Sequence, residues 1–276
     1  MAVAAELTTD PEEVLARGGE FLASDPVRHN LIATLLRARA SVPGEGRYVL
    51  AVEAGEVCGV VFQSPLTYVA TITPMPAAVS EACVDLLVRE GAELPGVNGE
   101  AGSTARFAGQ WSERTKSGAR PDQGLRIYEA QSIQMPPGVP GGLRRAALSD
   151  RTRIGELLRG FQEDTGEARP DDPVTDRRIA AGQFWLWEDP PALSMAALTP
   201  PILGVCRVQA VYTPPEWRNR GYAGAGVARL SAQTLESGHR CILYTDLGNP
   251  ISNSVYRRIG YRPVAECLRY SFGPRA

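Results

Sequence analysis

A segment rich in proline and glycine, Met135-Pro-Pro-Gly-Val-Pro-Gly-Gly142, divides the chain of 276 residues into two nearly equal parts. Proline removes an amide donor and glycine disfavours helix, so this segment predicts a connection rather than a helix or a strand. Each part has an ordinary domain size. The sequence therefore predicts domains at residues 1–135 and 143–276, joined by a linker at residues 136–142.

Both parts alternate strand-like and helix-like segments. In the first part, we expect helices from Pro11 and at residues 30–40 and 77–89, and strands at residues 47–53, 56–63 and 125–133. In the second part, we expect strands at residues 143–148, 184–188, 193–198, 204–212, 241–245 and 267–272, and helices at residues 150–161, 174–181, 222–236 and 251–259. This alternation predicts a mixed α/β sheet with right-handed crossovers. The two parts share an outline without an alignable motif, so a duplicated fold with a diverged first copy is a hypothesis.

Composition excludes several classes of partner and site. The formal net charge of -2 provides no global basic field for nucleic acid or an anionic membrane. The N-terminus lacks a basic region followed by an apolar run, and no stretch approaches the roughly 20 apolar residues of a membrane span, so a cytoplasmic location is expected. Five dispersed cysteines argue against a disulfide framework and a zinc site, and no metal is expected.

Residues 208–226 carry the clearest chemical signal. A strand ends near Tyr212, where Pro214-Pro215 cannot continue the ladder, and a short loop then leads into a helix. The first amides of a helix lack internal partners and carry the positive end of its dipole. Small residues at this entry would let a diphosphate approach those amides, while Arg218 and Arg220 add positive charge. The pattern predicts an anion cradle, with a tight turn into a packed helix as the alternative.

Two motifs resemble the GNAT superfamily of N-acetyltransferases. Arg218-Asn-Arg-Gly221-Tyr-Ala223 is similar to the family's diphosphate loop, Gln/Arg-x-x-Gly-x-Gly/Ala. Asn249 is followed seven positions later by Tyr256 and then by Gly260-Tyr261, as in a second signature of the family. The resemblance is specific over residues 204–270, weaker back to residue 143 and only architectural before that. It is closest to bacterial members with a divergent GNAT-like N-terminal half.

This resemblance implies an α/β (mixed α+β) fold with two GNAT-like domains, each a twisted mixed sheet flanked by helices. In the C-terminal domain, the strand before the loop would splay from its neighbour, and acetyl-CoA would bind there as a co-substrate. The residues implied in cofactor binding are Val211, Tyr212, Thr213, Arg218, Asn219, Arg220, Gly221, Tyr222, Ala223, Gly224, Asn249 and Asn253.

The resemblance also implies a mechanism. Tyr256 matches the family's frequent general acid, which would protonate the departing thiolate while a primary amine attacks directly in a ternary complex. Aromatic packing is the alternative role for Tyr256. A general base is not evident, because residues 205–212 contain no acid. Glu163, Asp164 and Glu167 could bind a cationic amine or relay a proton, or could form a solvated acidic turn.

Two other functions remain open from the sequence. A dinucleotide oxidoreductase would need a G-x-G-x-x-G order, which residues 221–226 do not have. A non-catalytic acyl-CoA-binding or sensor protein is the stronger alternative. The first part has no recognisable diphosphate loop, because residues 97–102 contain glycines without a flanking arginine, so this part could instead be structural or could dock another protein. For an enzyme, the expected acceptor is a small-molecule amine or a peptide amine. Its identity, the acyl chain, the oligomeric state and the role of the N-terminal part are not specified by the sequence.

Overall fold

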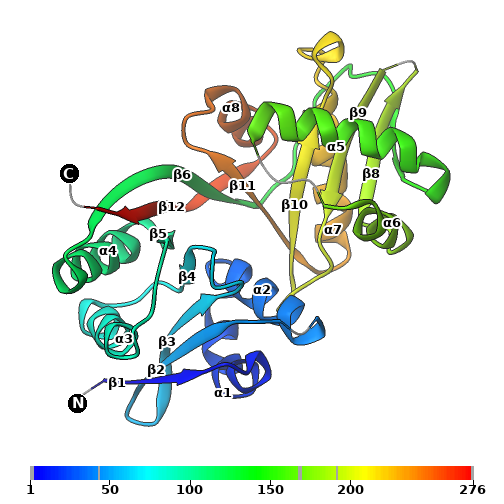
Figure 1. Cartoon of the computed structure of the whole chain (residues 1–276). Helices are drawn as coiled ribbons and strands as arrows, with labels where there is room; N and C mark the ends of the chain where they lie inside the picture. The colour runs from blue at the N-terminus through cyan, green and yellow to red at the C-terminus, as the bar shows by residue number, and fades with distance from the viewer. Residues whose placement is uncertain (1–2, 43, 167–169, 191, 275–276) are drawn as a thin grey trace. The chain divides into compact units, whose positions relative to one another are not determined.

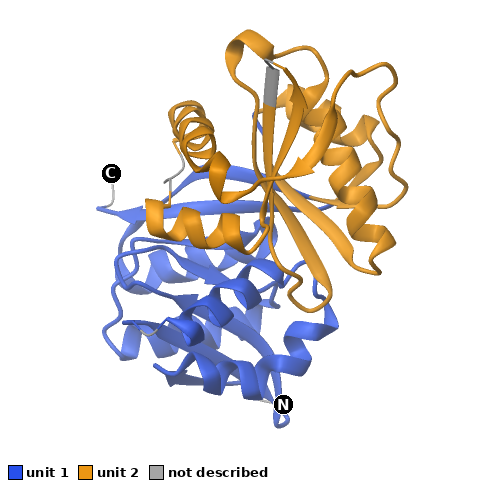
Figure 2. Ribbon diagram, turned by 90° about the vertical axis from the view of Figure 1, so that its right-hand side faces the viewer, with its two compact units in different colours: residues 1–127, 246–248, 264–276 blue, residues 128–245, 249–263 orange. Residues whose placement is uncertain are grey.

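The computed structural model describes residues 3–42, 44–166, 170–190 and 192–274. The chain forms two compact units, which are coloured separately in Figure 2. Unit 1 consists of Met1–Ile127, Asp246–Gly248 and Val264–Ala276, and unit 2 consists of Tyr128–Thr245 and Asn249–Pro263. Each unit therefore combines a long stretch of the chain with short pieces from elsewhere in the sequence.

Unit 1 contains a mixed sheet with helices. Its elements are β1 (Ala4–Thr8), α1 (Pro11–Ser24), α2 (Asn30–Ser41), β2 (Arg47–Glu53), β3 (Glu56–Gln63), β4 (Ala70–Ile72), α3 (Ala77–Arg89), β5 (Gly96–Glu100), α4 (Ala101–Thr115) and most of β6 (Gly118–Ala130). The strand order is β1-β2-β3-β4-β5-β12-β6, where β12 is the C-terminal strand Tyr261–Gly273. Strands β4 and β5 are parallel, whereas β1, β2, β3 and β4 pair in antiparallel fashion.

The strands of unit 2 also form both parallel and antiparallel pairs. Its elements are β7 (Gly142–Arg145), α5 (Arg151–Thr165), α6 (Asp172–Ala180), β8 (Phe184–Asp189), β9 (Ala192–Leu198), β10 (Val205–Tyr212), α7 (Tyr222–Glu236), β11 (Arg240–Asp246) and α8 (Pro250–Arg258), with short 3-10 turns at Leu148–Asp150 and Pro215–Trp217. The strand order is β11-β10-β9-β8-β7, and the end of β6 lies next to β11 (Figure 1). Strands β10 and β11 are parallel, while the other pairs from β7 to β10 are antiparallel.

The two parts of the chain repeat one order of elements. From β1 to β6 and again from β7 to β12, strand and helix follow each other as β-α-α-β-β-β-α-β-α-β. This repetition supports the hypothesis of a duplicated fold. The last strand of each repeat contributes to the other repeat's unit: residues 267–271 of β12 pair with β5 in unit 1, and residues 128–130 of β6 belong to unit 2.

Because of this exchange of strands, the compact units have other bounds than the domains expected at residues 1–135 and 143–276. Residues 264–276 belong to unit 1, and residues 136–142, expected to be a linker, lie within unit 2. Hydrophobic pattern alone does not reveal such an exchange, because a strand has the same alternation whichever sheet it joins. The expected sheet-and-helix architecture is confirmed.

Most expected elements are present, with some corrections. The strand expected at residues 143–148 is too long: β7 ends at Arg145, and Leu148 begins a 3-10 turn. The cause is Asp150, whose carboxylate accepts the Ala147 N–H at 2.8 Å and binds the Arg144 guanidinium at 2.7 and 2.8 Å. The sequence also missed β1, β4, β5 and α4, since β4 is short and β5 contains two glycines.

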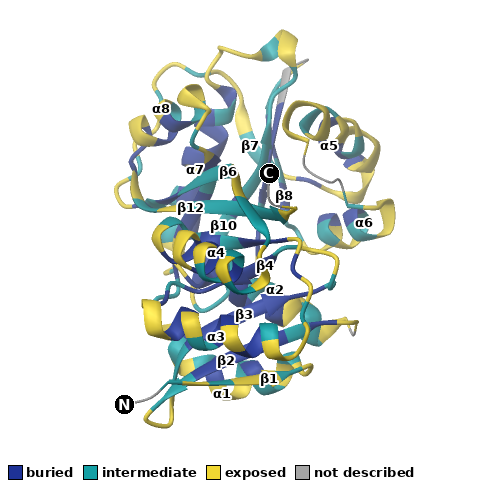
Figure 3. Ribbon diagram, turned by 60° about the vertical axis from the view of Figure 1, so that its left-hand side comes forward, coloured by how far each residue is buried: buried dark blue, intermediate teal, exposed yellow. Residues whose placement is uncertain are grey.

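Each unit has its own apolar core, which appears dark blue in Figure 3. In unit 1, side chains from the sheet pack against α3 and α4, with Phe107 and Trp111 among them. In unit 2, one core lies on the side of α7 and includes Val208 and Val227. The other lies on the side of α5 and α6 and includes Phe184. A sheet covered on both faces accounts for the apolar character of its strands.

Candidate active site

Strands β10 and β11 begin as a parallel pair and then part. The pairing runs from Val205 and Arg240 to Val208 and Leu243. Both strands continue beyond these residues, and no further pair joins them within the described part of the chain. The splayed strand pair expected from the sequence is therefore confirmed. Backbone groups of β10 after Val208 have no strand partner on this edge and are available to another group.

A β-bulge in β10 lies next to the parting. The register with β9 shifts between Gln209 and Tyr212, and Ala210 has a φ of +49°. A left-handed conformation is unfavourable for a residue with a Cβ, so the surrounding fold must impose it. As a result, Val208 packs on the side of α7 whereas Ala210, two residues later, packs on the side of α5 and α6, which breaks the usual alternation of a strand. Bulges re-aim strand residues in this way beside many active sites.

Ser194 of β9 fixes the end of β10. Its hydroxyl donates to the Tyr212 carbonyl at 3.2 Å and lies 2.8 Å from the Thr213 hydroxyl. Ser194 is buried. On the opposite side, a Cβ added to Gly160 of α5 would lie 2.3 Å from the Tyr212 hydroxyl, so the absence of a side chain there makes room for this ring. Contacts with β9 on one side and α5 on the other thus fix the position of Tyr212 and Thr213.

The loop from β10 to α7 presents unpaired amides. Asn219 and Gly221 have φ values of +63° and +85°, and Gly221 is the N-cap of α7. The Gly221 carbonyl accepts the Ala225 N–H at 2.9 Å, whereas the N–H groups of residues 219–224 donate to no acceptor in the described residues. Alternating backbone conformations of this kind form concave sites for anions at helix N-termini.

Close packing surrounds the glycines of this loop. A Cβ added to Gly221 would lie 3.0 Å from Cγ2 of Val139, and one added to Gly224 would lie 3.3 Å from Cγ1 of Val255. Val139 belongs to the segment expected as a linker, and the next residue, Pro140, accepts a hydrogen bond from Trp187 Nε1 at 2.9 Å. The segment therefore packs against the loop and leaves little space for a larger side chain.

The two arginines of the loop contact nearby aromatic rings. Arg218 lies over Tyr212, with its guanidinium carbon 5.6 Å from the ring centre, and Arg220 lies 4.9 Å from the Trp217 ring. The Nε of Arg218 donates to the Thr213 carbonyl at 2.9 Å, and its Nη2 pairs with Asp164 of α5. Asp164 therefore already neutralises part of the positive charge that Arg218 was expected to offer a diphosphate.

Other predicted residues near the loop differ in accessibility. The Tyr222 side chain is buried, and its hydroxyl donates to Asp189 at 2.6 Å, which leaves only its backbone for a ligand. Ala223 is half-buried and Gly224 is buried. Glu163 is exposed, and Glu167 lies outside the described residues.

The two predicted asparagines form part of a hydrogen-bond network at α8. Asn249 is the N-cap, with its Oδ1 accepting the Ser252 N–H at 3.0 Å. Asn253 donates from Nδ2 to the Asn249 carbonyl at 2.7 Å and accepts at Oδ1 from the Tyr128 hydroxyl at 3.0 Å. Arg257 Nε donates to the same hydroxyl at 3.1 Å. Tyr128, at the end of β6, was missed because no local pattern links it to α8.

Tyr256 lies on the buried face of α8. Its ring contacts the Tyr261 ring edge-on at 6.0 Å, and its hydroxyl bonds to no residue in the described ranges. Burial raises the pKa of Tyr256 to about 12. The Gly260-Tyr261 pair has a packing reason: Gly260 has a φ of +102°, and an added Cβ would lie 1.9 Å from the Ser132 carbonyl oxygen.

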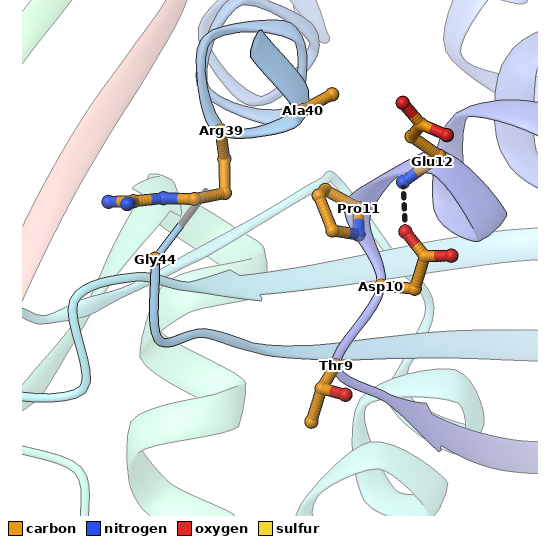
Figure 4. Close-up of a pocket in the computed structure, with 7 residues that line it drawn as sticks. All are labelled: Thr9, Asp10, Pro11, Glu12, Arg39, Ala40 and Gly44. Atoms are coloured by element: carbon orange, nitrogen blue, oxygen red, sulfur yellow. Dashed lines mark hydrogen bonds between the residues drawn. The ribbon is translucent and has the colours of Figure 1, made fainter. Parts of the chain in front are cut away.

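A separate cavity in unit 1 does not involve any predicted site residue. It has a volume of about 330 Å³ and lies at the start of α1 and the end of α2 (Figure 4). Its lining residues are Thr9, Asp10, Pro11, Glu12, Arg39, Ala40 and Gly44. Asp10 caps α1 by accepting the Glu12 N–H at 2.8 Å, so its carboxylate already has a structural role. The splayed strands of unit 2 are the better candidate site.

Two searches of the structure were negative. Across residues 3–42, 44–166, 170–190 and 192–274, no group of three or more histidine, cysteine, aspartate or glutamate side chains could hold a metal ion. Over the same ranges, the helices are too short or too polar to span a membrane.

Comparison with known proteins places this geometry in context. The family model described as FR47-like protein matches residues 194–270, which include the parting strands, the loop and α8. An acetyltransferase of the GNAT family from Colwellia psychrerythraea has a similar structure, with a TM-score of 0.61 at 11% identity over 97% of this chain and 99% of that chain. The chain has the GNAT fold.

Other GNAT structures agree with this assignment. A GCN5-related N-acetyltransferase from Sphaerobacter thermophilus gives a TM-score of 0.63 at 16% identity, over 97% of this chain and 94% of that one. A protein described as a putative acetyltransferase from Pyrococcus horikoshii gives 0.54 at 13% identity, over 100% and 90%. A search of curated proteins found no match. The resemblance to the GNAT superfamily drawn from the two motifs is thus confirmed at the level of the fold.

Proposed function

We propose that this chain is an N-acetyltransferase that moves an acetyl group from acetyl-CoA to a primary amine in a ternary complex. The observation that supports this proposal is the parting of β10 and β11 directly before a loop of unpaired amides at the N-terminus of α7. Acetyl-CoA would supply the activated acetyl thioester. The coarser activity, acyl transfer, is suggested by the GNAT relatives.

The residues of the loop fit a diphosphate. The N–H groups of residues 219–224 have no acceptor in the described chain, and they lie at the positive end of a helix. Gly221 and Gly224 lie close to the side chains of Val139 and Val255, so a side chain at either glycine would fill the remaining space. Arg220 stacks on Trp217 and adds positive charge beside these amides. Arg218 would contribute less, because Asp164 already pairs with it.

The end of β10 would bind and orient the acyl part. Backbone groups of Val211, Tyr212 and Thr213 follow the bulge, and Ser194 holds the carbonyl of Tyr212. Pre-positioned N–H donors stabilise negative charge that develops on an acyl oxygen, and they need no reorganisation during the reaction. Asn249 and Asn253 would contact the cofactor arm only through groups that their mutual hydrogen bonds leave available.

Tyr256 would act as the general acid. Because burial raises its pKa to about 12, its hydroxyl keeps the proton throughout the neutral range. The hydroxyl bonds to no described residue, so a departing thiolate would not compete with a protein acceptor for this proton. The amine acceptor would be a small molecule or a peptide and would attack directly, without an enzyme nucleophile.

Binding and turnover test this proposal separately. Calorimetry on the full chain is expected to detect binding of both CoA and acetyl-CoA, and a thiol-release assay over pooled amines is expected to detect transfer. Tyr256→Phe should lower kcat by about 100-fold or more while changing acetyl-CoA affinity little. Equal turnover in wild type and variant would assign Tyr256 to packing alone. Absence of heat with either ligand would refute the cofactor site.

An acyl-CoA-binding or sensor protein without catalysis is the second candidate. The observation that favours it is the absence of any acidic residue in β10, where a general base could otherwise contact the amine. Tight binding of acetyl-CoA without thiol release over the amine panel would support this function.

A further inference from the structure

Two polar side-chain atoms on one face of α6 are buried without a partner. Thr175 Oγ1 and Arg178 Nη2 are inaccessible to solvent, and neither forms a hydrogen bond within the described residues. They lie three positions apart on the helix, so their side chains are neighbours. A buried donor without an acceptor costs about 1–3 kcal/mol, and more when it is charged. Such a pair is expected to have an acceptor that belongs to another molecule.

Arg207 of β10 comes near Arg178 through β9. The Arg207 N–H donates to Thr199 Oγ1 at 2.9 Å, and the residue before Thr199, Leu198, donates to the carbonyl of Gln183, whose side chain Arg178 binds. Burial and the charge of Arg207 on β10 both lower the pKa of Arg178.

Arg178 is fixed by a hydrogen bond from Nε to Gln183 Oε1 at 3.0 Å, and its guanidinium carbon lies 4.8 Å from the Phe184 ring. Arg207 is held over the Tyr244 ring at 5.5 Å. Both arginines are thus pre-positioned, although their charges repel each other.

Among the described residues, no carboxylate pairs with either of these two charges. In the described chain, neither Arg178 nor Arg207 forms an ion pair, whereas Arg144 of the same unit pairs with both Asp150 and Glu188. Thr175 Oγ1 and Arg178 Nη2 thus provide donors without an acceptor in the described residues, and the Arg207 guanidinium adds a second positive charge. Carboxylate and phosphate groups have the charge and the oxygen geometry that such donors bind best.

The position of these donors relates them to the candidate active site. Arg207 comes directly before Val208, where the pairing of β10 with β11 ends. The bulge turns Ala210 and Tyr212 onto the side of the sheet covered by α5 and α6, where Ile179, the neighbour of Arg178, also packs. Arg207 precedes Ala210 by three residues, which is roughly 10 Å along a strand. A small molecule could extend over this distance.

We propose that Thr175, Arg178 and Arg207 bind an anionic oxygen group, a carboxylate or a phosphate, and that the amine acceptor carries this group. The inference rests on the proposed acetyltransferase function and narrows its substrate class. The anion would anchor the acceptor beside α6, and the amine at its other end would reach the parted strands. Neutral amines and simple polyamines would then be poor acceptors.

A binding experiment tests the anion site without relying on activity. Thermal unfolding of the full chain is measured with increasing succinate and, separately, inorganic phosphate; the larger increase in Tm identifies the preferred anion. The increase should be lost in Arg178→Gln and Arg207→Gln, and retained in the charge-matched surface variant Arg229→Gln. It should also persist in Gly221→Val, which alters the diphosphate loop. No increase in wild type, or loss only in Gly221→Val, would overturn the proposal.

Kinetics test the connection to the acceptor. Amines are compared in pairs that differ only in the anion: an amino acid and its carboxamide, and an amino alcohol and its phosphate ester. Arg178→Gln and Arg207→Gln should raise KM for the charged member at least 10-fold, with a smaller change in kcat and no change for the neutral member. Equal KM values within each pair in wild type would refute this role. If no amine is acetylated, the proposed function fails, while the unfolding experiment still decides the anion site.

Discussion

The same strand-to-helix connection occurs once in each unit, and the two versions differ in the amides that the connection offers before the helix begins. In unit 2, residues 213–221 connect β10 to α7, and the N–H groups of residues 219–221 donate to no acceptor in the described residues. In unit 1, the corresponding connection from β4 to α3 is Thr73-Pro-Met-Pro76. The two prolines have no N–H, Thr73 donates to the Val60 carbonyl at 3.0 Å, and Met75 donates to Ser103 at 3.0 Å. Residues 73–76 therefore have no unpaired amide, and only the first turn of α3 could offer N–H groups to an anion.

The strand pairs next to these connections also differ: β10 and β11 part in unit 2, whereas β4 and β5 stay close together in unit 1. In unit 1, a Cβ added to Gly99 of β5 would lie 2.8 Å from the carbonyl oxygen of Ile72 at the end of β4, so no gap opens between these strands. Phe107 occupies the place in α4, counted from the first helical residue, that Tyr256 occupies in α8. One order of elements can therefore form a closed core or an open site. Each connection contains two prolines, so the difference lies in the length of the loop, the positions of its prolines and a single hydroxyl group.

Removal of the exchanged strand should have the largest effect. A chain ending at Pro263 lacks the part of β12 that pairs with β5 and contributes Tyr270 and Phe272 to the core of unit 1. The loss should cost at least about 3 kcal/mol, because it removes two partly buried aromatic side chains together with the pairing to β5, and truncation of one fully buried aromatic residue alone costs about that much. Limited proteolysis should cut unit 1 first. Equal protease resistance of the full-length and truncated chains would contradict the pairing described for unit 1.

The next largest effect concerns the anion cradle. Gly221→Val places a β-branched residue at a φ of +85° and 3.0 Å from Val139, so CoA affinity should fall by about 30-fold or more. Ala78→Val, an exposed position in the first turn of the corresponding helix α3, should leave the affinity unchanged. Calorimetry measures both variants, and thermal unfolding checks that each is folded. Equal affinity losses would remove the contrast between the two junctions.

A titration sharpens the comparison between Tyr256 and Phe107. Because burial raises the folded-state pKa of Tyr256 to about 12, its contribution to stability is complete below the unfolded value of about 10. That contribution is lost as the pH rises from about 10 to 12. The tyrosinate absorbance difference between wild type and Tyr256→Phe should therefore appear only near pH 12. A midpoint near 10 would mean that the phenol is solvated.

The smallest expected effect tests the strained bulge. Ala210→Gly should stabilise the chain by roughly 0.5–1 kcal/mol, because glycine adopts a positive φ without steric cost. Ala51→Gly, in an extended strand of unit 1, should destabilise it by a similar amount. Urea unfolding measures both changes. The two changes in the free energy of unfolding must have opposite signs. Stabilisation by both substitutions would contradict backbone strain at Ala210.

Local features of the site could be predicted from the sequence because they depend on neighbouring residues. Pro214-Pro215 ends a strand, Gly221 permits a positive φ, and small residues open α7; each of these properties acts within a few positions. Helices α3 and α7 and strands β2 and β3 have the ranges expected from pattern alone. The two motifs also indicated the splayed strands correctly.

Contacts between residues far apart in sequence required the tertiary structure. Only the folded chain shows that Tyr128 bonds to Asn253, that Asp164 pairs with Arg218 and that the segment expected as a linker covers Gly221. The same holds for the exchange of β6 and β12, since hydrogen-bonding edges are alike in every strand and sequence alternation does not name a partner. The sequence by itself determined the chemistry of the loop, whereas packing decided which charges and amides remain available to a ligand.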